Sequence, residues 1–311
     1  MKLIVLLLGF SVQCAAQNIT VVQAEKLSEE IVNCIKKNSI FRDSLNFEAI
    51  EKDFTQYIDT LNTYQKVGYY YTMQLRKVGD KHSFYTNKSA LDNFSKKQKD
   101  SIGFSYQLLE GDIGYLNVPG FLSTDQKVID SFANQIHNAI RELDNKANIT
   151  GWIVDLRNNT GGNMWPMVLG LHPLIGNDIP GYFKLANKKH LIGWSTVPPQ
   201  SDISIEAPYQ VKDLKNKIAV LYSKRTVSSG EMTAICFIGK PNTRSFGTIT
   251  GGYTTGNEIN YLSEGNIFVL ASTYVLDRNK KIYTGCITPD VLIDKQDNDT
   301  VIEQAKAWIK Q

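Results

Sequence analysis

Residues 20 to 80 carry apolar side chains at helical spacing. In each of two segments these positions form one face of a helix. A third segment continues the pattern through Tyr69, Met73 and Leu75. The spacing predicts a small helical region that packs on something larger. Its apolar positions are Ala24, Leu27, Ile31 and Ile35 in the first segment and Phe47, Ile50, Phe54, Ile58 and Leu61 in the second.

The pattern changes after this region. Residues 84–107 are polar and rich in lysine, which predicts a connecting loop or a solvated helix. A strand is predicted at 113–118, an amphipathic helix at 128–143, and a strand at 152–156 that is apolar throughout. Strand, helix and strand at this spacing form a βαβ unit, and a continuous apolar strand is typical of a parallel sheet that is buried on both faces.

The second half of the chain alternates between short apolar runs and polar turns. The proline-bearing segment 195–213 is long enough to form part of a site rim. The predicted organisation is a helical region with its connector at 17–100, followed by an α/β domain at 101–311. The further predicted elements are strands at 182–185, 191–194, 218–222, 259–262 and 267–271 and a closing helix at about 300–310.

The first residues have the order of an export signal. Lys2 supplies a positive start, a short apolar core follows, and Cys14-Ala15-Ala16 resembles a small-residue cleavage site. The core is too short to span a bilayer, so we expect a signal peptide of residues 1–16 and a mature chain that is periplasmic or secreted. Lipid attachment at Cys14 is disfavoured because Gln13 is not the small residue expected before a modified cysteine.

Composition and charge exclude some classes of partner. The chain has 311 residues, of which 42% are hydrophobic and 21% charged, an ordinary globular composition. Its net charge of +3 is too small to indicate nucleic acid as a partner. No stretch after the signal is long and apolar enough to predict a membrane helix.

The cysteines and most histidines predict neither a metal nor a cofactor. Cys34, Cys236 and Cys286 remain after the signal, so at most one disulfide can form, and their spacing fits no metal site. We expect Cys34 and Cys236 to be small core residues. Apart from His82 the histidines are scattered, and His137 lies on a polar helix face where we expect it to be solvated.

A polar turn at 223–231 lies between an apolar strand and an amphipathic segment. This order places Ser228 and Ser229 at the start of a helix, where unpaired N–H groups and the positive end of the helix dipole stabilise negative charge. A serine there can be a nucleophile. Ser228 and Glu231 also have the S-x-x-E spacing of a capping box, and the stretch taken alone favours the cap.

A glycine pair and a histidine become candidate catalytic groups if Ser228 is a nucleophile. Gly161 and Gly162 follow the buried strand, where glycines permit positive φ and expose N–H groups to an oxyanion, although a tight turn explains them equally well. His82 follows a helix and a glycine turn. Alone it is best explained as an exposed loop residue, but paired with a serine it is a candidate general base.

Five short motifs occur in the order seen in one family. Together they resemble the tail-specific (C-terminal processing) serine peptidases, and the first is similar to a segment of the tricorn-like branch. The resemblance covers about residues 20–311. The motifs are D-x-H-S at Asp80–Ser83, DLRNNTGGN at Asp155–Asn163, TVSSGE at Thr226–Glu231, G-x-x-T-G-G at Gly247–Gly252 and I-x-P-D at Ile287–Asp290.

The resemblance implies a crotonase-like α/β catalytic core preceded by a helical region. It implies Ser228 as the nucleophile and His82 as its general base, with an oxyanion hole formed by the backbone N–H groups of Gly161, Gly162 and Ser229. The implied reaction is acyl transfer through a covalent ester, and the implied substrate is a peptide or an unfolded protein.

The sequence departs from the family in three places. Residues 251–253 contain no lysine, which disfavours the Ser-Lys pair of many members. Lys81 stands where tricorn-like members have a serine, and no acid lies at Tyr283-Thr284 to complete a tetrad. The connector after His82 is shorter than the roughly 50 residues that a PDZ domain needs, so tail specificity is not implied. The residues that stay open as candidates to orient the imidazole are Asp80, Ser83, Glu231 and Glu258.

Other functions remain as alternatives. An inactive relative that binds peptides or glycans in the same cleft is the main one, because the lysine and the late acid are missing. A crotonase-fold enzyme acting on a thioester is disfavoured by the export signal, and an α/β-hydrolase by the lack of a G-x-S-x-G elbow around Ser228. Trp165, Trp194 and Tyr253 are candidates to line a pocket, although packing is the commoner role of aromatic residues near turns.

Overall fold

The structure is a computed structural model that describes residues 18–91, 93, 103–123, 125–186, 188, 190–195, 202–293 and 298–311. The expected signal peptide and Cys14 lie outside these residues. The chain divides into two compact units. We call residues 18–93 with 258–270 the helical unit, and residues 94–257 with 271–311 the sheet unit.

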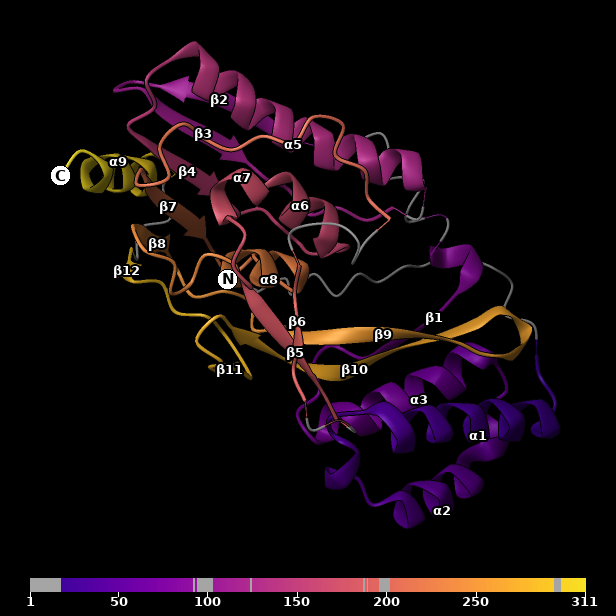
Figure 1. Cartoon of the computed structure of the whole chain (residues 1–311). Helices are drawn as coiled ribbons and strands as arrows, with labels where there is room; N and C mark the ends of the chain where they lie inside the picture. Colours follow the sequence, from indigo (N-terminus) through magenta and orange to yellow (C-terminus); the bar gives the residue numbers. More distant parts are fainter. Residues whose placement is uncertain are drawn as a thin grey trace. The chain divides into compact units, whose positions relative to one another are not determined.

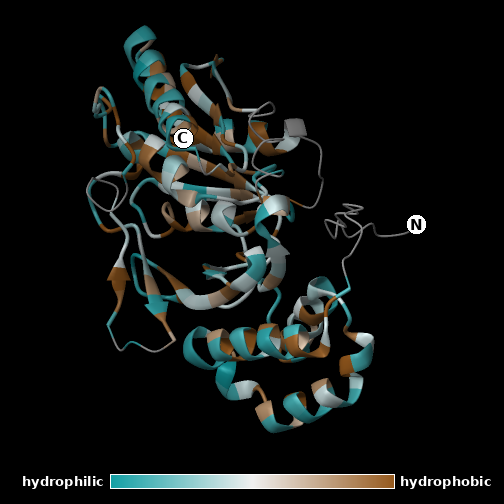
Figure 2. Ribbon diagram, turned by 90° about the vertical axis from the view of Figure 1, so that its right-hand side faces the viewer, coloured by the Kyte–Doolittle hydropathy of each residue, from teal (hydrophilic) through white to brown (hydrophobic). Residues whose placement is uncertain are grey.

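Three helices of the helical unit confirm the periodicity of its sequence. They are α1 (Val21–Asn38), α2 (Phe47–Tyr57) and α3 (Tyr64–Lys77), with short 3₁₀ turns at Arg42–Ser44 and Ile58–Thr60 (Figure 1). Each helix begins after a polar residue whose side chain accepts a hydrogen bond from the first turn, namely Thr20, Asn46 and Thr63. In Figure 2 hydrophobic and hydrophilic residues alternate along these helices, as in amphipathic helices.

The core of the helical unit includes residues from far along the chain. Phe268 and Leu270 are buried in the same hydrophobic cluster as Leu27, Ile31 and Leu75. These two residues lie in β10 (Asn266–Asp277), which contributes residues 266–270 to the helical unit and 271–277 to the sheet unit. The observed division therefore differs from the expected one, because the apolar face of residues 258–270 completes the helical core.

The connector after the helices is partly strand. β1 (Phe84–Asn87) pairs antiparallel with residues 266–269, and β2 (Ser105–Leu109) pairs antiparallel with β3 (Ile113–Asn117). The expectation of a loop or a solvated helix over 84–107 was wrong for these segments. Their side chains are largely exposed, so their hydropathy gives no sign of a strand. Backbone pairing with a more apolar neighbouring strand decides their conformation.

The sheet unit contains the predicted βαβ motif. β3 and β4 (Gly151–Asp155) are parallel neighbours joined through α5 (Gln126–Lys146). The strand order is β12-β8-β7-β4-β3-β2, parallel except for β2. The remaining strands of this sheet are β7 (Lys217–Tyr222), β8 (Thr243–Gly247) and β12 (Val291–Leu292).

Helices bury both faces of this sheet. Val154 of β4 packs in a core with residues of α5, α6 (Met164–Gly170), α7 (His172–Ile175) and α8 (Ser229–Ile235). Its neighbour Ile153 belongs to a second core, which the closing helix α9 (Asn298–Ile309) covers. Burial on both faces explains why β4 is apolar throughout.

The remaining strands of the sheet unit include the predicted pair. β5 (Gly181–Leu185) and β6 (Ile192–Gly193) are antiparallel, and β5 also pairs with residues 273–277 of β10. β9 (Thr255–Tyr261) precedes β10 in the chain and pairs with it, and its residues 258–261 belong to the helical unit. β11 (Ile282–Tyr283) pairs with Val275 and Leu276 of β10.

The described part of the proline-bearing loop lies along α5. Asn134 Nδ2 donates to Ser204 O across 2.7 Å, and Tyr209 Oη donates to Asp144 Oδ2 across 2.7 Å. This segment is therefore a strap on the helix, and nothing in its described contacts makes it a rim of the serine elbow.

His137 is buried, and the expectation of a solvated side chain was wrong. Only 1% of the residue is exposed, and neither ring nitrogen makes a hydrogen bond of good geometry with another described residue. Burial lowers its pKa to about 4, and the positive groups of His172 and Arg141 lower it further. The polar helix face is covered by the strap and by α6, a tertiary contact that the helix pattern does not reveal.

Candidate active site

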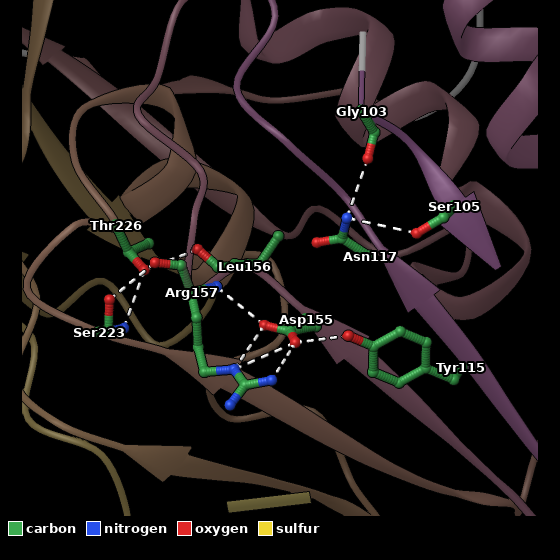
Figure 3. Close-up of polar contacts among 9 residues, drawn as sticks. All are labelled: Gly103, Ser105, Tyr115, Asn117, Asp155, Leu156, Arg157, Ser223 and Thr226. Carbon is green, nitrogen blue, oxygen red and sulfur yellow. Dashed lines mark hydrogen bonds and ion pairs between the residues drawn. The ribbon is translucent and has the colours of Figure 1, made fainter. Parts of the chain in front are cut away.

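Ser228 lies at the elbow between β7 and α8, as the sequence predicts. Its φ of 55° and ψ of −122° are uncommon for a residue other than glycine, and surrounding contacts must hold such a backbone. Thr226 Oγ1 donates to Leu156 O across 2.8 Å, and Ser223 Oγ donates to Arg157 O across 2.7 Å. Both carbonyls lie directly after β4 (Figure 3). The elbow is thus fastened to the neighbouring strand.

Glu231 fixes the elbow from the other side. Its carboxylate is fully buried and accepts from Ser228 N (3.0 Å), Thr250 Oγ1 (2.5 Å), Gly252 N (2.8 Å) and Tyr253 N (2.7 Å). Burial raises the pKa of Glu231, and the four hydrogen bonds oppose that shift. The capping box predicted from S-x-x-E is present, with the Ser228 side chain at the Glu231 amide and the Glu231 carboxylate at Ser228 N. The same carboxylate also binds the G-x-x-T-G-G segment.

The glycine pair lies against the serine. Gly161 and Gly162 have φ values of 90° and 113°, which fits the expected need for glycine. A Cβ placed on Gly161 would lie 2.8 Å from Ser228 Cβ and 3.4 Å from Ser228 Oγ. Ser229 Oγ also donates to Gly162 O across 2.5 Å, which joins the elbow to the glycine pair although the two residues are 67 positions apart in sequence.

The three amides expected at an oxyanion hole are not equivalent. Gly161 N already donates to Asn159 Oδ1 across 3.0 Å. Gly162 N and Ser229 N make no hydrogen bond to an acceptor within the part of the chain that the structure describes. Of the three amides, those of Gly162 and Ser229 therefore remain as donors, and Gly161 contributes the close approach of its backbone to Ser228.

Asp155 begins the DLRNNTGGN motif but is occupied by a structural ion pair. Its carboxylate accepts from Arg157 Nη2 across 2.6 Å and from Tyr115 Oη across 2.7 Å (Figure 3). Both charged side chains are largely buried, and they form the turn that follows β4. Figure 3 also shows Asn117 bound to Gly103 and Ser105 at the edge of the sheet.

His82 follows α3 in the helical unit, after Gly79 with φ of 95°. Asp80 is fully buried, and its Oδ1 accepts from His82 N (2.8 Å) and Ser83 N (3.0 Å). Ser83 Oγ donates to Asp80 Oδ2 across 2.5 Å, and Arg76 lies 3.7 Å from Oδ1. Asp80 therefore holds the backbone that carries the imidazole.

The other two candidates to orient His82 have described partners elsewhere. Glu258 accepts from Asn38 Nδ2 across 3.0 Å within the helical unit. Glu231 binds the amides of Ser228, Gly252 and Tyr253 in the sheet unit.

Trp194, Cys34 and Cys236 lie outside these motifs. Trp194 is buried against Gly181 and Phe183, which fits packing and not a pocket wall. Cys34 is half-buried and Cys236 fully buried, as expected for core residues, and burial raises the pKa of Cys236 to about 12. The described residues contain no group of three or more potential metal ligands and no helix suited to cross a membrane.

Sequence reasoning missed two residues that hold this site together. Asn159 is fully buried and binds the glycine turn, and Thr250 binds Glu231 and, through its Oγ1, the amide of Ile287. Both residues lie inside motifs that the sequence analysis singles out, so membership of a motif is the sequence feature that could have identified them.

Comparison with known proteins gives consistent matches. Residues 112–293 match the model of peptidase family S41. The "Nisin-resistance protein" of Lactococcus lactis subsp. lactis is 31% identical over 274 residues, covering 87% of this chain and 83% of the relative.

Solved structures are similar as well. A lipoprotein from Streptococcus agalactiae has a TM-score of 0.77 and 26% identity, with 92% of this chain and 96% of that chain covered. The photosystem II D1 C-terminal processing protease has a TM-score of 0.61 and 12% identity, with 92% and 97% covered, a likeness of fold.

Proposed function

Because the chain belongs to peptidase family S41, we propose that it is an exported serine peptidase that hydrolyses peptide bonds through an acyl-enzyme on Ser228, with His82 as general base. The observation that carries this proposal is the elbow itself. Ser228 has a strained backbone and lies against Gly161, and the next residue, Ser229, donates through Oγ to Gly162 O. A serine that only capped a helix would not need such surroundings.

The proposed chemistry assigns a role to each group. His82 takes the proton of the Ser228 hydroxyl as Oγ attacks the peptide carbonyl, which requires an imidazole nitrogen within about 2.6–3.2 Å of Oγ. The tetrahedral oxyanion is stabilised by Gly162 N–H and Ser229 N–H. The protonated imidazole then gives its proton to the leaving amine, and water hydrolyses the resulting ester.

Asp80 is the favoured positioning group for His82. It binds the backbone amides of His82 and Ser83 and is itself held by Arg76. Residues 251–253, where many family members place a lysine, contain none, so a histidine base is the better proposal. We infer that the core is crotonase-like.

The proposed substrate is a flexible peptide or an unfolded protein outside the cytoplasm. The name of the Lactococcus relative makes nisin the first peptide to test. Because the short connector does not imply recruitment of C-terminal tails, peptides with free and with amidated C-termini should be cleaved equally well. Strict dependence on a free carboxylate would contradict this part of the proposal.

A fluorophosphonate probe tests the assignment without a known substrate. In the mature chain we expect labelling of wild type, none of Ser228→Ala, and strongly impaired labelling of His82→Ala. Circular dichroism of each variant controls for folding. If folded wild type is not labelled, the proposed activity fails, and binding of peptides or glycans in the same cleft becomes the better function.

A further inference from the structure

Asn159 occupies a central place beside the proposed oxyanion hole. Its side chain is fully buried and uses both ends of the amide. Nδ2 donates to Val118 O and Pro119 O, each across 3.2 Å, and lies 3.0 Å from Met167 Sδ. Oδ1 accepts from Gly161 N across 3.0 Å. One side chain thus joins the end of β3, the helix α6 and the glycine turn.

The backbone of Asn159 also binds the serine elbow. Its carbonyl accepts from Val227 N, the residue before Ser228, across 3.1 Å. A Cβ on Gly230, two residues after the serine, would lie only 2.7 Å from both Asn159 O and Asn159 Oδ1. Asn159 therefore contacts the chain on both sides of Ser228 and also holds the glycine turn.

We propose that Asn159 is a positioning residue that sets the spacing between the amides of Gly162 and Ser229, and so completes the oxyanion hole. This inference rests on the proposed peptidase function and deepens it. Asn159 does not touch the reacting atoms. By accepting from Gly161 N, the Asn159 side chain occupies that amide. The next amide, Gly162 N, is left as the donor that the turn offers to the oxyanion.

Only a carboxamide satisfies all of these partners. Two carbonyl oxygens and a thioether sulfur require a donor, while Gly161 N requires an acceptor on the same planar group. Aspartate keeps the shape and the acceptor but places negative charge against two carbonyl oxygens. Since a buried group left without its partner is costly, the turn is expected to shift away from its native place.

The test compares Asn159→Asp with Asn134→Asp in the mature chain. Asn134 is a matched control because it is a buried asparagine of the sheet unit that donates to Asp130 O and Ser204 O and accepts from Glu206 N. The readouts are the limiting rate of fluorophosphonate labelling, the probe concentration at half-maximal rate, and the melting temperature. Rates are normalised to the folded fraction.

We expect Asn159→Asp to lower the limiting labelling rate by about 10–100-fold while the half-maximal probe concentration changes little, because the tetrahedral adduct needs the oxyanion donors and initial binding does not. Asn134→Asp should lower the melting temperature and leave the limiting rate unchanged. Equal limiting rates in the two variants, or a loss confined to probe binding, would overturn the inference.

If Asn159→Asp does not fold, a milder variant tests the same inference. Met167→Leu conserves volume in the core but removes the sulfur acceptor of Asn159 Nδ2. We expect the limiting rate to fall by a few-fold with unchanged probe binding, and an unchanged rate contradicts the inference. Absence of labelling in wild type instead defeats the proposed function, so the two failures are distinguishable.

Discussion

Glu231 accepts a hydrogen bond from the backbone amide of Ser228 across 3.0 Å, although its carboxylate is fully buried. The other donors to this carboxylate are a hydroxyl and two amides from residues 250–253, and none of the four carries a positive charge. Four hydrogen bonds compensate for the lost hydration of the carboxylate. The elbow and residues 250–253 therefore share one anchor, and a change at Glu231 should disturb both.

Replacement Glu231→Gln should lower both stability and reactivity. An amide group presents two N–H donors where all four partners are donors, so at least one buried group loses its bond. We expect a loss of about 1–3 kcal/mol in the free energy of unfolding and a clear fall in the labelling rate of Ser228. Urea unfolding and probe kinetics measure the two effects. The control is Glu303→Gln, an exposed member of an ion pair with Lys306, which should change stability by less than about 1 kcal/mol.

Replacement Gly161→Ala should abolish the reactivity of Ser228. The new methyl group would lie 2.8 Å from Ser228 Cβ, on a backbone whose φ of 90° already strains an alanine. Gly176→Ala is the matched control, because its φ is 88° and the nearest atom is Lys240 Nζ at 3.8 Å. Both variants should lose about 1 kcal/mol or more of stability from the backbone. Normal labelling of folded Gly161→Ala would refute the close approach.

Replacement Asp80→Asn should impair the helical unit around His82. Asn can keep Oδ1 as the acceptor of the His82 and Ser83 amides, but it turns Oδ2, which accepts from Ser83 Oγ, into a donor. It also removes the negative charge that faces Arg76 and strengthens these hydrogen bonds. We expect a loss of about 1–3 kcal/mol and a slower reaction of Ser228. Asp43→Asn, at a side chain 90% exposed, is the control and should leave both quantities unchanged. A fully active Asp80→Asn enzyme would argue against Asp80 as the positioning group.

His137 should make stability fall as the pH falls below neutrality. Its folded pKa of about 4 lies below the ordinary value of 6.5, so the unfolded chain binds the proton first. The contribution of the neutral ring is complete above pH 6.5 and decreases down to about pH 4. We expect a loss of roughly 1–2 kcal/mol across this window, with allowance for screening by solvent.

Urea unfolding at several pH values measures the effect of His137. His137→Gln should flatten the curve between pH 4 and 6.5, because glutamine does not titrate in the window set by His137. His172→Gln keeps the buried ring of His137 and should retain most of the slope, because burial is the main cause of the lowered pKa and His172 adds to it. Parallel curves for wild type and His137→Gln would assign the pH dependence to other groups.

The sequence by itself determined the local elements of both units. Helical periodicity predicted α1, α2 and α3, and the apolar runs around residues 113–156 predicted a βαβ motif. The short motifs also singled out Ser228 at its elbow and the glycine pair with positive φ. These features follow from patterns within a few residues, because side-chain spacing and backbone freedom are local properties.

Only the tertiary structure decided which distant groups meet. Asn159 joins Val118, Met167 and Val227, and Glu231 binds Tyr253, although no local pattern pairs these positions. The same limit explains the burial of His137. A buried polar group takes whichever partner the packed chain brings within hydrogen-bond distance, so its role is fixed only when the chain has folded.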